Sequence, residues 1–112
     1  MLPKEYRIKE GKEYAYLYRT GKKANGRYIF IYFINNDFLF NRFGIVTSKR
    51  VGNAVIRNKV KRRLRAIIQA NPFFLEKQIN MIIVAKKNSN QANYKELEKD
   101  FLEVMKKAKI LC

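Results

Sequence analysis

Residues 54–70 combine apolar side chains at helical spacing with an opposite face made almost entirely of cations. At about 100° per residue, one stripe of the predicted helix can be buried, and it consists of Ile56, Val60, Leu64, Ile67 and Ile68. Asn53 precedes the helix as a candidate N-cap, and Asn71 and Pro72 mark its end. Because only one side of the helix is apolar, we expect it to cover a sheet with that side.

Three segments have the composition of strands. Residues 27–34 are rich in aromatic and β-branched side chains, and residues 42–47 return as a second strand after turn residues 35–37. The short connection predicts that these two strands pair antiparallel. Residues 78–85 are mostly apolar, which predicts a central strand buried on both faces.

Two further helices are predicted, over residues 10–20 and 94–109. The first carries Tyr14, Leu17 and Tyr18 at helical spacing, with Gly21 just past its end. The last presents a core-facing stripe of Leu97, Phe101, Val104, Met105 and Ala108. The element order is α-β-β-α-β-α, so we predict an α+β fold: a single-domain sandwich over residues 1–112, with helices against a small mixed sheet.

The chemistry of catalysis is poorly represented in this chain. It contains no histidine, and none of its nine acidic residues lies between Asp37 and Glu76. Glu96, Asp100 and Glu103 share one helical face, but interleaved lysines favour a solvated face there. We therefore expect no catalytic residue, no metal site and no cofactor bound by the protein alone.

The charge predicts a polyanionic partner. Twenty-five basic and nine acidic residues give a net charge of +16, far more than solubility requires. Residues 49–65 include eight basic residues and no acidic one. Arg57–Lys61 and Lys61–Arg65 are like-charge pairs at i, i+4, which oppose each other by a few tenths of a kcal/mol each. An external anion would relieve this repulsion, and nucleic acid is favoured over a merely solvated face or an anionic membrane surface.

Residues 44–65 closely resemble the signature of the bacterial ribonuclease P protein family. That signature joins a Ser-Lys-Lys/Arg-x-Gly-Asn-Ala-Val loop to an Arg-Asn-Arg-x-Lys-Arg-x-x-Arg helix. The matching residues are Ser48, Lys49, Arg50, Gly52, Asn53, Ala54, Val55, Arg57, Asn58, Lys61, Arg62 and Arg65. Lys59 stands where the family more often has arginine, which keeps the charge but loses the bidentate fork. Tyrosines in the first helix replace the commoner phenylalanines.

The resemblance implies a fold and a role. The fold would be ribosomal protein S5 domain 2-like, with an unusual left-handed β-α-β crossover around the basic helix. The protein would be the subunit of ribonuclease P that binds the catalytic RNA and the 5′ leader of precursor tRNA. The RNA subunit would carry the catalytic Mg²⁺ that the holoenzyme requires, and no obligate protein partner is expected.

The resemblance also assigns two sets of binding residues. Catalytic RNA would contact Lys49, Arg50, Asn53, Arg57, Asn58, Lys59, Lys61, Arg62 and Arg65. The leader would lie in a cleft between the first helix and the sheet, against Tyr14, Tyr18 and Tyr32, where aromatic rings can stack on bases. Tyr28 and Phe30 share the alternating face of Tyr32, but aromatic residues on a strand are more typical of core, and we expect both there.

The sequence favours a cytoplasmic protein that is not bound to a membrane. Its single cysteine, Cys112, permits no intramolecular disulfide, no stretch approaches ~18 apolar residues, and the first residues lack an apolar signal core. Three alternatives remain open: another RNA-binding module such as a ribosomal protein of similar fold, a stand-alone nuclease, and a sequence-specific DNA-binding protein.

Overall fold

Strand β4 (Ile79–Ala85) lies inside a four-stranded sheet of order β1-β2-β4-β3. It pairs antiparallel with β2 (Ile29–Asn35) and parallel with β3 (Arg42–Thr47). Most of its side chains are buried, which confirms the prediction of a central strand covered on both faces. The structure is a computed structural model that describes residues 7–8, 11–36, 41–70 and 78–109.

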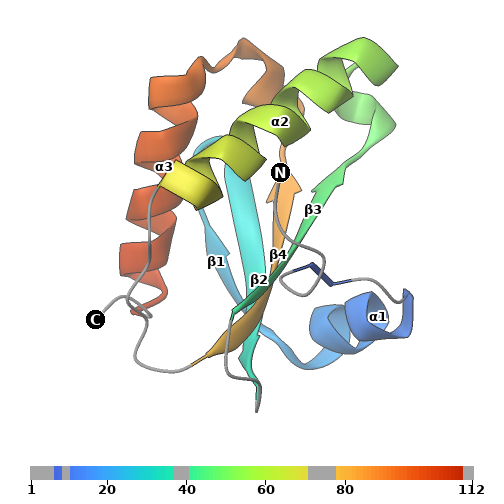
Figure 1. Ribbon diagram of the computed structural model, residues 1–112, viewed down its shortest axis with the longest axis vertical. Coiled ribbons are helices and arrows are strands. Elements are labelled where there is room, and N and C mark those ends of the chain that lie inside the picture. The colour runs from blue at the N-terminus through green and yellow to red at the C-terminus, as the bar shows by residue number, and fades with distance from the viewer. Residues whose placement is uncertain (1–6, 9–10, 37–40, 71–77, 110–112) are drawn as a thin grey trace.

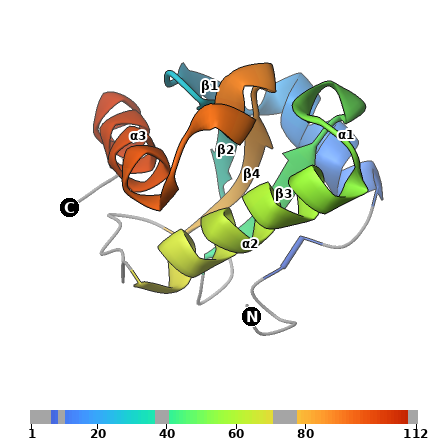
Figure 2. The same cartoon turned by 90° about the horizontal axis from the view of Figure 1, so that it is seen from above.

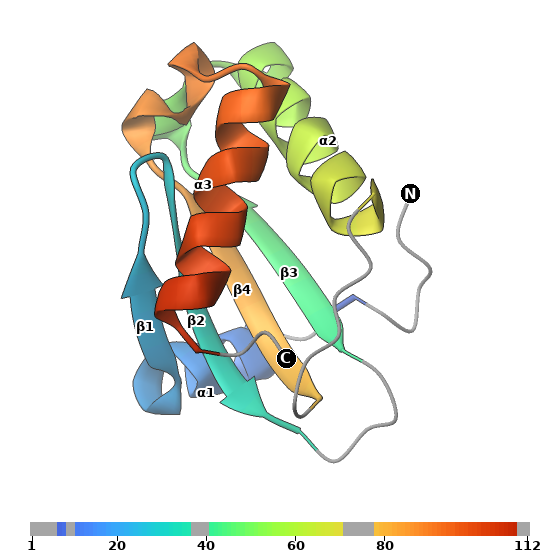
Figure 3. The same ribbon diagram turned by 90° about the vertical axis from the view of Figure 1, so that its left-hand side faces the viewer.

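Helices cover both faces of this sheet. Helices α2 (Ala54–Ala70) and α3 (Tyr94–Lys107) lie on one face, and α1 (Gly11–Thr20) lies on the other (Figures 1 and 2). Figure 3 shows α3 running along β1 and β2, with α2 beside it over β3. This arrangement confirms the predicted α+β sandwich with a mixed sheet. No helix in the described residues is long and apolar enough to cross a membrane.

The β3-α2-β4 unit has the handedness that the family resemblance implies. In Figure 1, β3 and β4 run upward in parallel and α2 connects them on the near side of the sheet. β4 lies to the left of β3 in this view, so the crossover is left-handed. General chirality rules predict the opposite hand for nearly all such connections.

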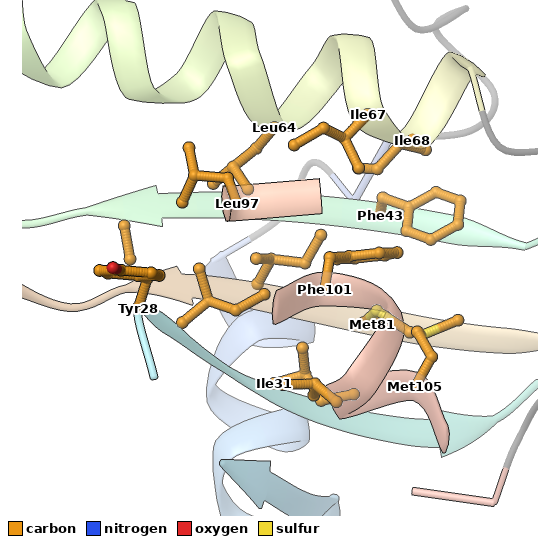
Figure 4. Packing of buried hydrophobic residues seen from close by; sticks show 14 of the residues in the cluster. Tyr28, Ile31, Phe43, Leu64, Ile67, Ile68, Met81, Leu97, Phe101 and Met105 are labelled. Atoms are coloured by element: carbon orange, nitrogen blue, oxygen red, sulfur yellow. The ribbon is translucent and has the colours of Figure 1, made fainter. Parts of the chain in front are cut away.

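The larger core lies between the sheet and the two helices α2 and α3 (Figure 4). Val60, Leu64, Ile67 and Ile68 of α2 are buried, as are Leu97, Phe101, Val104 and Met105 of α3. Both predicted apolar stripes are therefore confirmed, with Ile56 and Ala108 partly buried at their edges. Burial of one such aliphatic or aromatic side chain contributes roughly 1.5–3 kcal/mol.

A smaller core lies under α1, on the other face. Ile8, Leu17 and Ile82 are buried there, and Tyr14 and Tyr32 pack against them while remaining partly exposed. The two faces of the sheet differ in how completely helices cover them. The α2–α3 side is closed by helices, whereas the single helix on the α1 side leaves aromatic side chains of the sheet at the surface.

The predicted pairing of residues 27–34 with residues 42–47 is wrong. β2 and β3 are separated by β4, because β4 is the segment whose side chains are apolar on both faces and therefore takes the inner position. β2 instead pairs antiparallel with β1 (Lys22–Asn25), a short edge strand that the sequence did not indicate. The sequence Lys-Lys-Ala-Asn has no β-forming pattern, and its pairing depends on the neighbouring strand.

The acidic face of α3 is also different from the prediction. Asp100 is only 5% exposed, and its carboxylate accepts hydrogen bonds from the backbone amides of Arg27 at 2.7 Å, Tyr28 at 2.8 Å and Ile29 at 3.1 Å. It joins α3 to the start of β2. Tyr28, which precedes β2, is buried with the larger core, so it is a core residue as expected but does not share the face of Tyr32.

The remaining differences are at element boundaries. The segment between β4 and α3 contains a 3-10 helix, η3 (Lys87–Gln91), and another, η2 (Lys49–Val51), lies in the loop before α2. Asp37 of the predicted turn, and the helix stop at Asn71 and Pro72, lie outside the described residues.

Candidate nucleic-acid interface

The basic side chains of α2 lie on its outer face. Asn58, Lys59 and Arg62 are exposed, and Arg57, Lys61 and Arg65 are partly exposed. The opposite stripe of the helix is fixed in the core, so this cationic face cannot rotate inward. The Nε atom of Arg57 is buried and has no hydrogen-bond partner in the described structure, which leaves a donor for an acceptor from outside.

In the part of the chain that the structure describes, none of the basic side chains of α2 forms an ion pair with a carboxylate. Val55, Asn58, Arg62 and Arg65 line a shallow hollow on this face, and the Val55 side chain is 74% exposed. Two guanidinium groups beside an amide and an apolar side chain can bind phosphate while covering part of a sugar or base.

The loop before α2 is held in place by two hydrogen bonds and by the backbone conformation of Gly52. Asn53 accepts a hydrogen bond from the backbone N–H of Ile56 at 3.0 Å, which confirms it as the N-cap of α2. The side-chain amide of Asn90 donates to the Val51 carbonyl at 2.7 Å, so η3 supports η2. Gly52 has φ of +152°, and an added Cβ would lie 2.9 Å from the Ile56 side chain. Lys49, Arg50 and Asn53 are exposed on this supported loop.

We expect Gly52→Ala to lower the free energy of unfolding by about 1–3 kcal/mol, because it combines backbone strain with a steric overlap. The matched control is Gly11→Ala, where nothing lies within 4 Å of an added Cβ. Urea denaturation followed by circular dichroism measures both changes. Equal stability of the two variants would contradict the strained geometry at Gly52.

A second group of cations, not predicted from the sequence, lies beside Arg50. These cations line a second hollow, which is formed by residues from three segments: Arg27, Arg50, Lys86, Lys87, Asn88, Asn90 and Gln91. Lys86 donates to the Gly26 carbonyl at 2.5 Å, and Asn88 donates to the Arg27 carbonyl at 3.2 Å. In the sequence, only the adjacent lysines Lys86 and Lys87, which follow β4, could have indicated this group of cations. The fold brings them beside Arg50 of the η2 loop. The cationic surface therefore extends from α2 across η2 to η3.

The three tyrosines predicted to bind the leader come together where α1 meets the sheet. The rings of Tyr18 and Tyr32 pack edge to face, with centroids 5.0 Å apart. Tyr14 packs against the smaller core and its hydroxyl points to the Ile8 carbonyl. Gly44 of β3 makes room for it, because an added Cβ would overlap the Tyr14 hydroxyl. Tyr18 is 41% exposed and is the most accessible of the three.

Tyr14 and Tyr18 remain neutral at physiological pH. Burial raises the pKa of the Tyr14 hydroxyl above its usual value near 10, and the neighbouring Glu13 carboxylate raises it further. Burial also raises the pKa of Tyr18, with smaller contributions from Tyr14 and Tyr32. A neutral phenol donates a hydrogen bond and does not repel phosphate.

Phe30 belongs with these tyrosines and not with the core as predicted. It lies on the same face of β2 as Tyr32, is partly exposed, and packs edge to face with Tyr32 at 5.8 Å between centroids. The prediction failed because a strand covered by a single helix leaves part of its face open. Tyr18, Tyr32 and Phe30 thus form a row of three rings, which we call the aromatic row.

Three of the described acidic side chains have structural partners that stabilise the fold. Glu13 forms an ion pair with Arg42 at 2.9 Å, Asp100 binds three backbone amides, and Glu96 completes a capping box with Asn93. Among the residues that the structure describes, no group of three or more His, Cys, Asp or Glu side chains could hold a metal ion. The described surface therefore offers exposed cations on the α2 side of the sheet and exposed aromatic rings on the α1 side.

Comparison with known proteins gives a consistent result. The sequence model of the family described as Ribonuclease P matches residues 2–109. The ribonuclease P protein component of Syntrophomonas wolfei is 38% identical over 96% of this chain and 91% of its own length. That of Clostridium botulinum strain Langeland is 35% identical, covering 96% and 97%.

Solved structures similar to this chain are also ribonuclease P proteins. The structure of the Staphylococcus aureus RNase P protein superimposes with a TM-score of 0.87 at 29% identity, covering 96% of this chain and 98% of that one. The RNase P protein from Thermotoga maritima has a TM-score of 0.81 at 23% identity, covering 90% and 96%, and supports the fold alone.

Proposed function

Since the chain belongs to the ribonuclease P protein component family, we propose that it binds the catalytic RNA subunit of ribonuclease P and the 5′ leader of precursor tRNA. In this role it assists the endonucleolytic removal of the leader that produces the mature tRNA 5′ end. The observation that carries the proposal is the cationic face of α2 and η2, which has no carboxylate partner in the described residues.

The proposal divides the work between RNA and protein. The RNA subunit supplies the catalytic Mg²⁺, and the protein supplies phosphate-binding cations and a surface for single-stranded RNA. The structural engagement of Glu13, Glu96 and Asp100 supports this division, because these carboxylates are held in contacts that stabilise the fold. Clustered carboxylates are what a protein needs to bind catalytic metal ions itself.

The positions of the two surfaces support separate binding partners. Helices α2 and α1 lie on opposite faces of the sheet (Figure 2). The exposed cations of α2 are therefore on one side of the sheet, and the aromatic row is on the α1 side. The η2 loop and the cations around Arg50 lie at the end of the sheet, between the two. Structured RNA bound at α2 and a single strand passing the aromatic row can therefore be held at the same time.

Tyr18→Ala is expected to raise the KM of the reconstituted holoenzyme for leader-bearing precursor tRNA by roughly five- to tenfold. Stacking of one base on an aromatic side chain contributes roughly 1–3 kcal/mol. The matched control is Tyr16→Ala, which removes a similarly exposed tyrosine (50%) of the same helix that is not part of the aromatic row. Steady-state cleavage of leader-bearing and leaderless substrates measures the effect, and equal losses on both substrates would indicate a folding defect instead.

Cleavage of precursor tRNA at low Mg²⁺ tests the proposed function directly. The purified protein is mixed with a bacterial ribonuclease P RNA that is active alone at high Mg²⁺. The proposal predicts leader removal at low Mg²⁺ only when both components are present. Cleavage by the protein without RNA would establish a stand-alone nuclease. Binding of RNA without any stimulation of cleavage would favour a general RNA-binding module such as a ribosomal protein.

A further inference from the structure

Lys23 lies at the end of the aromatic row, on the edge strand β1. It pairs with Tyr32 in the antiparallel register of β1 and β2. Its ammonium nitrogen is 4.4 Å from the centroid of the Phe30 ring and 5.6 Å from that of Tyr32. Lys23 therefore points to the α1 side of the sheet, and its neighbour Lys22 pairs with Phe33, whose side chain belongs to the opposite, larger core.

We propose that Lys23 and Phe30 form a further nucleotide subsite for the single-stranded leader, beyond Tyr18 and Tyr32. The Lys23 ammonium binds a phosphate of the strand, and the open part of the Phe30 ring contacts the adjoining base or sugar. This inference rests on the proposed leader binding and extends it by one named position at the outer edge of the sheet.

The geometry of the rings supports a path along the sheet. The contacts Tyr18–Tyr32 and Tyr32–Phe30 are both edge to face, at interplanar angles of 83° and 76°. Rings in this arrangement do not cover one another's faces completely, so each keeps surface for a ligand. The row leads from α1 to Tyr32 and then along β2 to Phe30, and Lys23 reaches the Phe30 end of the row from the neighbouring edge strand β1.

The cation–π contact prepares the lysine for phosphate. A free lysine side chain has up to about 2 kcal/mol of rotamer entropy to lose on binding. Contact with Phe30 and Tyr32 already restricts Lys23 to the aromatic row, so less entropy remains to be lost. At an exposed site the contact itself is weak, roughly 0.5–1 kcal/mol, and an incoming phosphate can replace it. For Lys22 the structure records no such contact with a ring.

Charge-matched variants test the subsite in the reconstituted holoenzyme. Lys23→Ala and Lys22→Ala remove the same charge from adjacent residues on opposite faces of β1. The quantity to be measured for each holoenzyme is the Kd for precursor tRNA without a leader, with a short leader and with a long leader, at several salt concentrations. For the long leader, Lys23→Ala should raise the Kd roughly threefold and reduce the salt slope by about 0.7. Lys22→Ala should change neither value, and Lys23→Arg should retain most of the affinity.

The outcomes separate this inference from the function on which it rests. If wild-type holoenzyme binds leader-bearing and leaderless substrates equally, leader binding itself is wrong and the subsite falls with it. If the wild type prefers the leader but Lys23→Ala and Lys22→Ala behave alike, only the subsite is overturned. A Lys23→Ala variant with reduced thermal stability and unchanged leader affinity would also overturn it, because the lysine would then serve only to cover Phe30.

Discussion

Asp100→Ala will reduce the free energy of unfolding by about 3 kcal/mol or more. The Asp100 carboxylate is buried and accepts hydrogen bonds from three successive backbone amides at the start of β2. Removing it leaves these donors without their acceptor, and a buried donor that loses its partner costs about 1–3 kcal/mol. The change also disconnects α3 from β2 at one end of the larger core. Denaturant unfolding followed by circular dichroism, at a fixed phosphate concentration, gives the difference.

Two variants make this result specific. Glu103→Ala removes the same charge from an exposed position one turn along α3, and its effect should stay within about 0.5 kcal/mol. Asp100→Asn retains one acceptor oxygen and should give an intermediate loss. If Asp100→Ala is no less stable than Glu103→Ala, the carboxylate is not the anchor that its geometry indicates.

Replacing Arg62 and Arg65 together with alanine will weaken binding to the ribonuclease P RNA by about a hundredfold. Each arginine can form charge-assisted hydrogen bonds to phosphate worth about 1.5 kcal/mol or more, and the two line one hollow on α2. The slope of log K against log salt should also fall, by roughly 0.7–0.9 for each lost phosphate contact. Filter binding over a range of salt concentrations measures both quantities.

A charge-matched control distinguishes contact from long-range attraction. Lys95→Ala with Lys106→Ala removes two cations from exposed positions on α3, and leaves the α2 face intact. This variant should lose only a small part of the affinity. An unchanged salt slope in the Arg62 and Arg65 variant would show that these residues do not touch phosphate, and equal losses in the two variants would leave net charge as the only determinant.

The elements that followed from local pattern were predicted well. The bounds of α2 and the buried stripes of α2 and α3 could be read from apolar periodicity, because a helix on a sheet buries one stripe and exposes the other. Asn53 as the cap, and β4 as the inner strand, followed from side-chain chemistry in the same way. The basic face of α2 was visible for the complementary reason, since charged residues that cannot enter the core must lie outside.

The order of the strands did not follow from local pattern. β2 and β3 are neighbours along the chain, but β4 enters between them, and β1 has no strand signal until β2 offers its edge. The left-handed crossover contradicts the general rule and was expected only from the resemblance to a family (Figure 1). Pairing between segments far apart in sequence depends on competition among strands for the buried positions.

The surroundings of Asp100, Phe30 and the Lys86-Lys87 pair could not be predicted from local pattern either, because they depend on segments far apart in the sequence. Asp100 looks like part of a solvated acidic face until the start of β2 brings three amides to it. Phe30 looks like a core residue until one helix, covering only part of the sheet, leaves it beside Lys23. Lys86 and Lys87 join Arg50 only when β4 ends beside η2. Periodicity tells which side of an element faces the core, but what lies opposite an exposed or polar side chain depends on chain segments that folding brings from elsewhere.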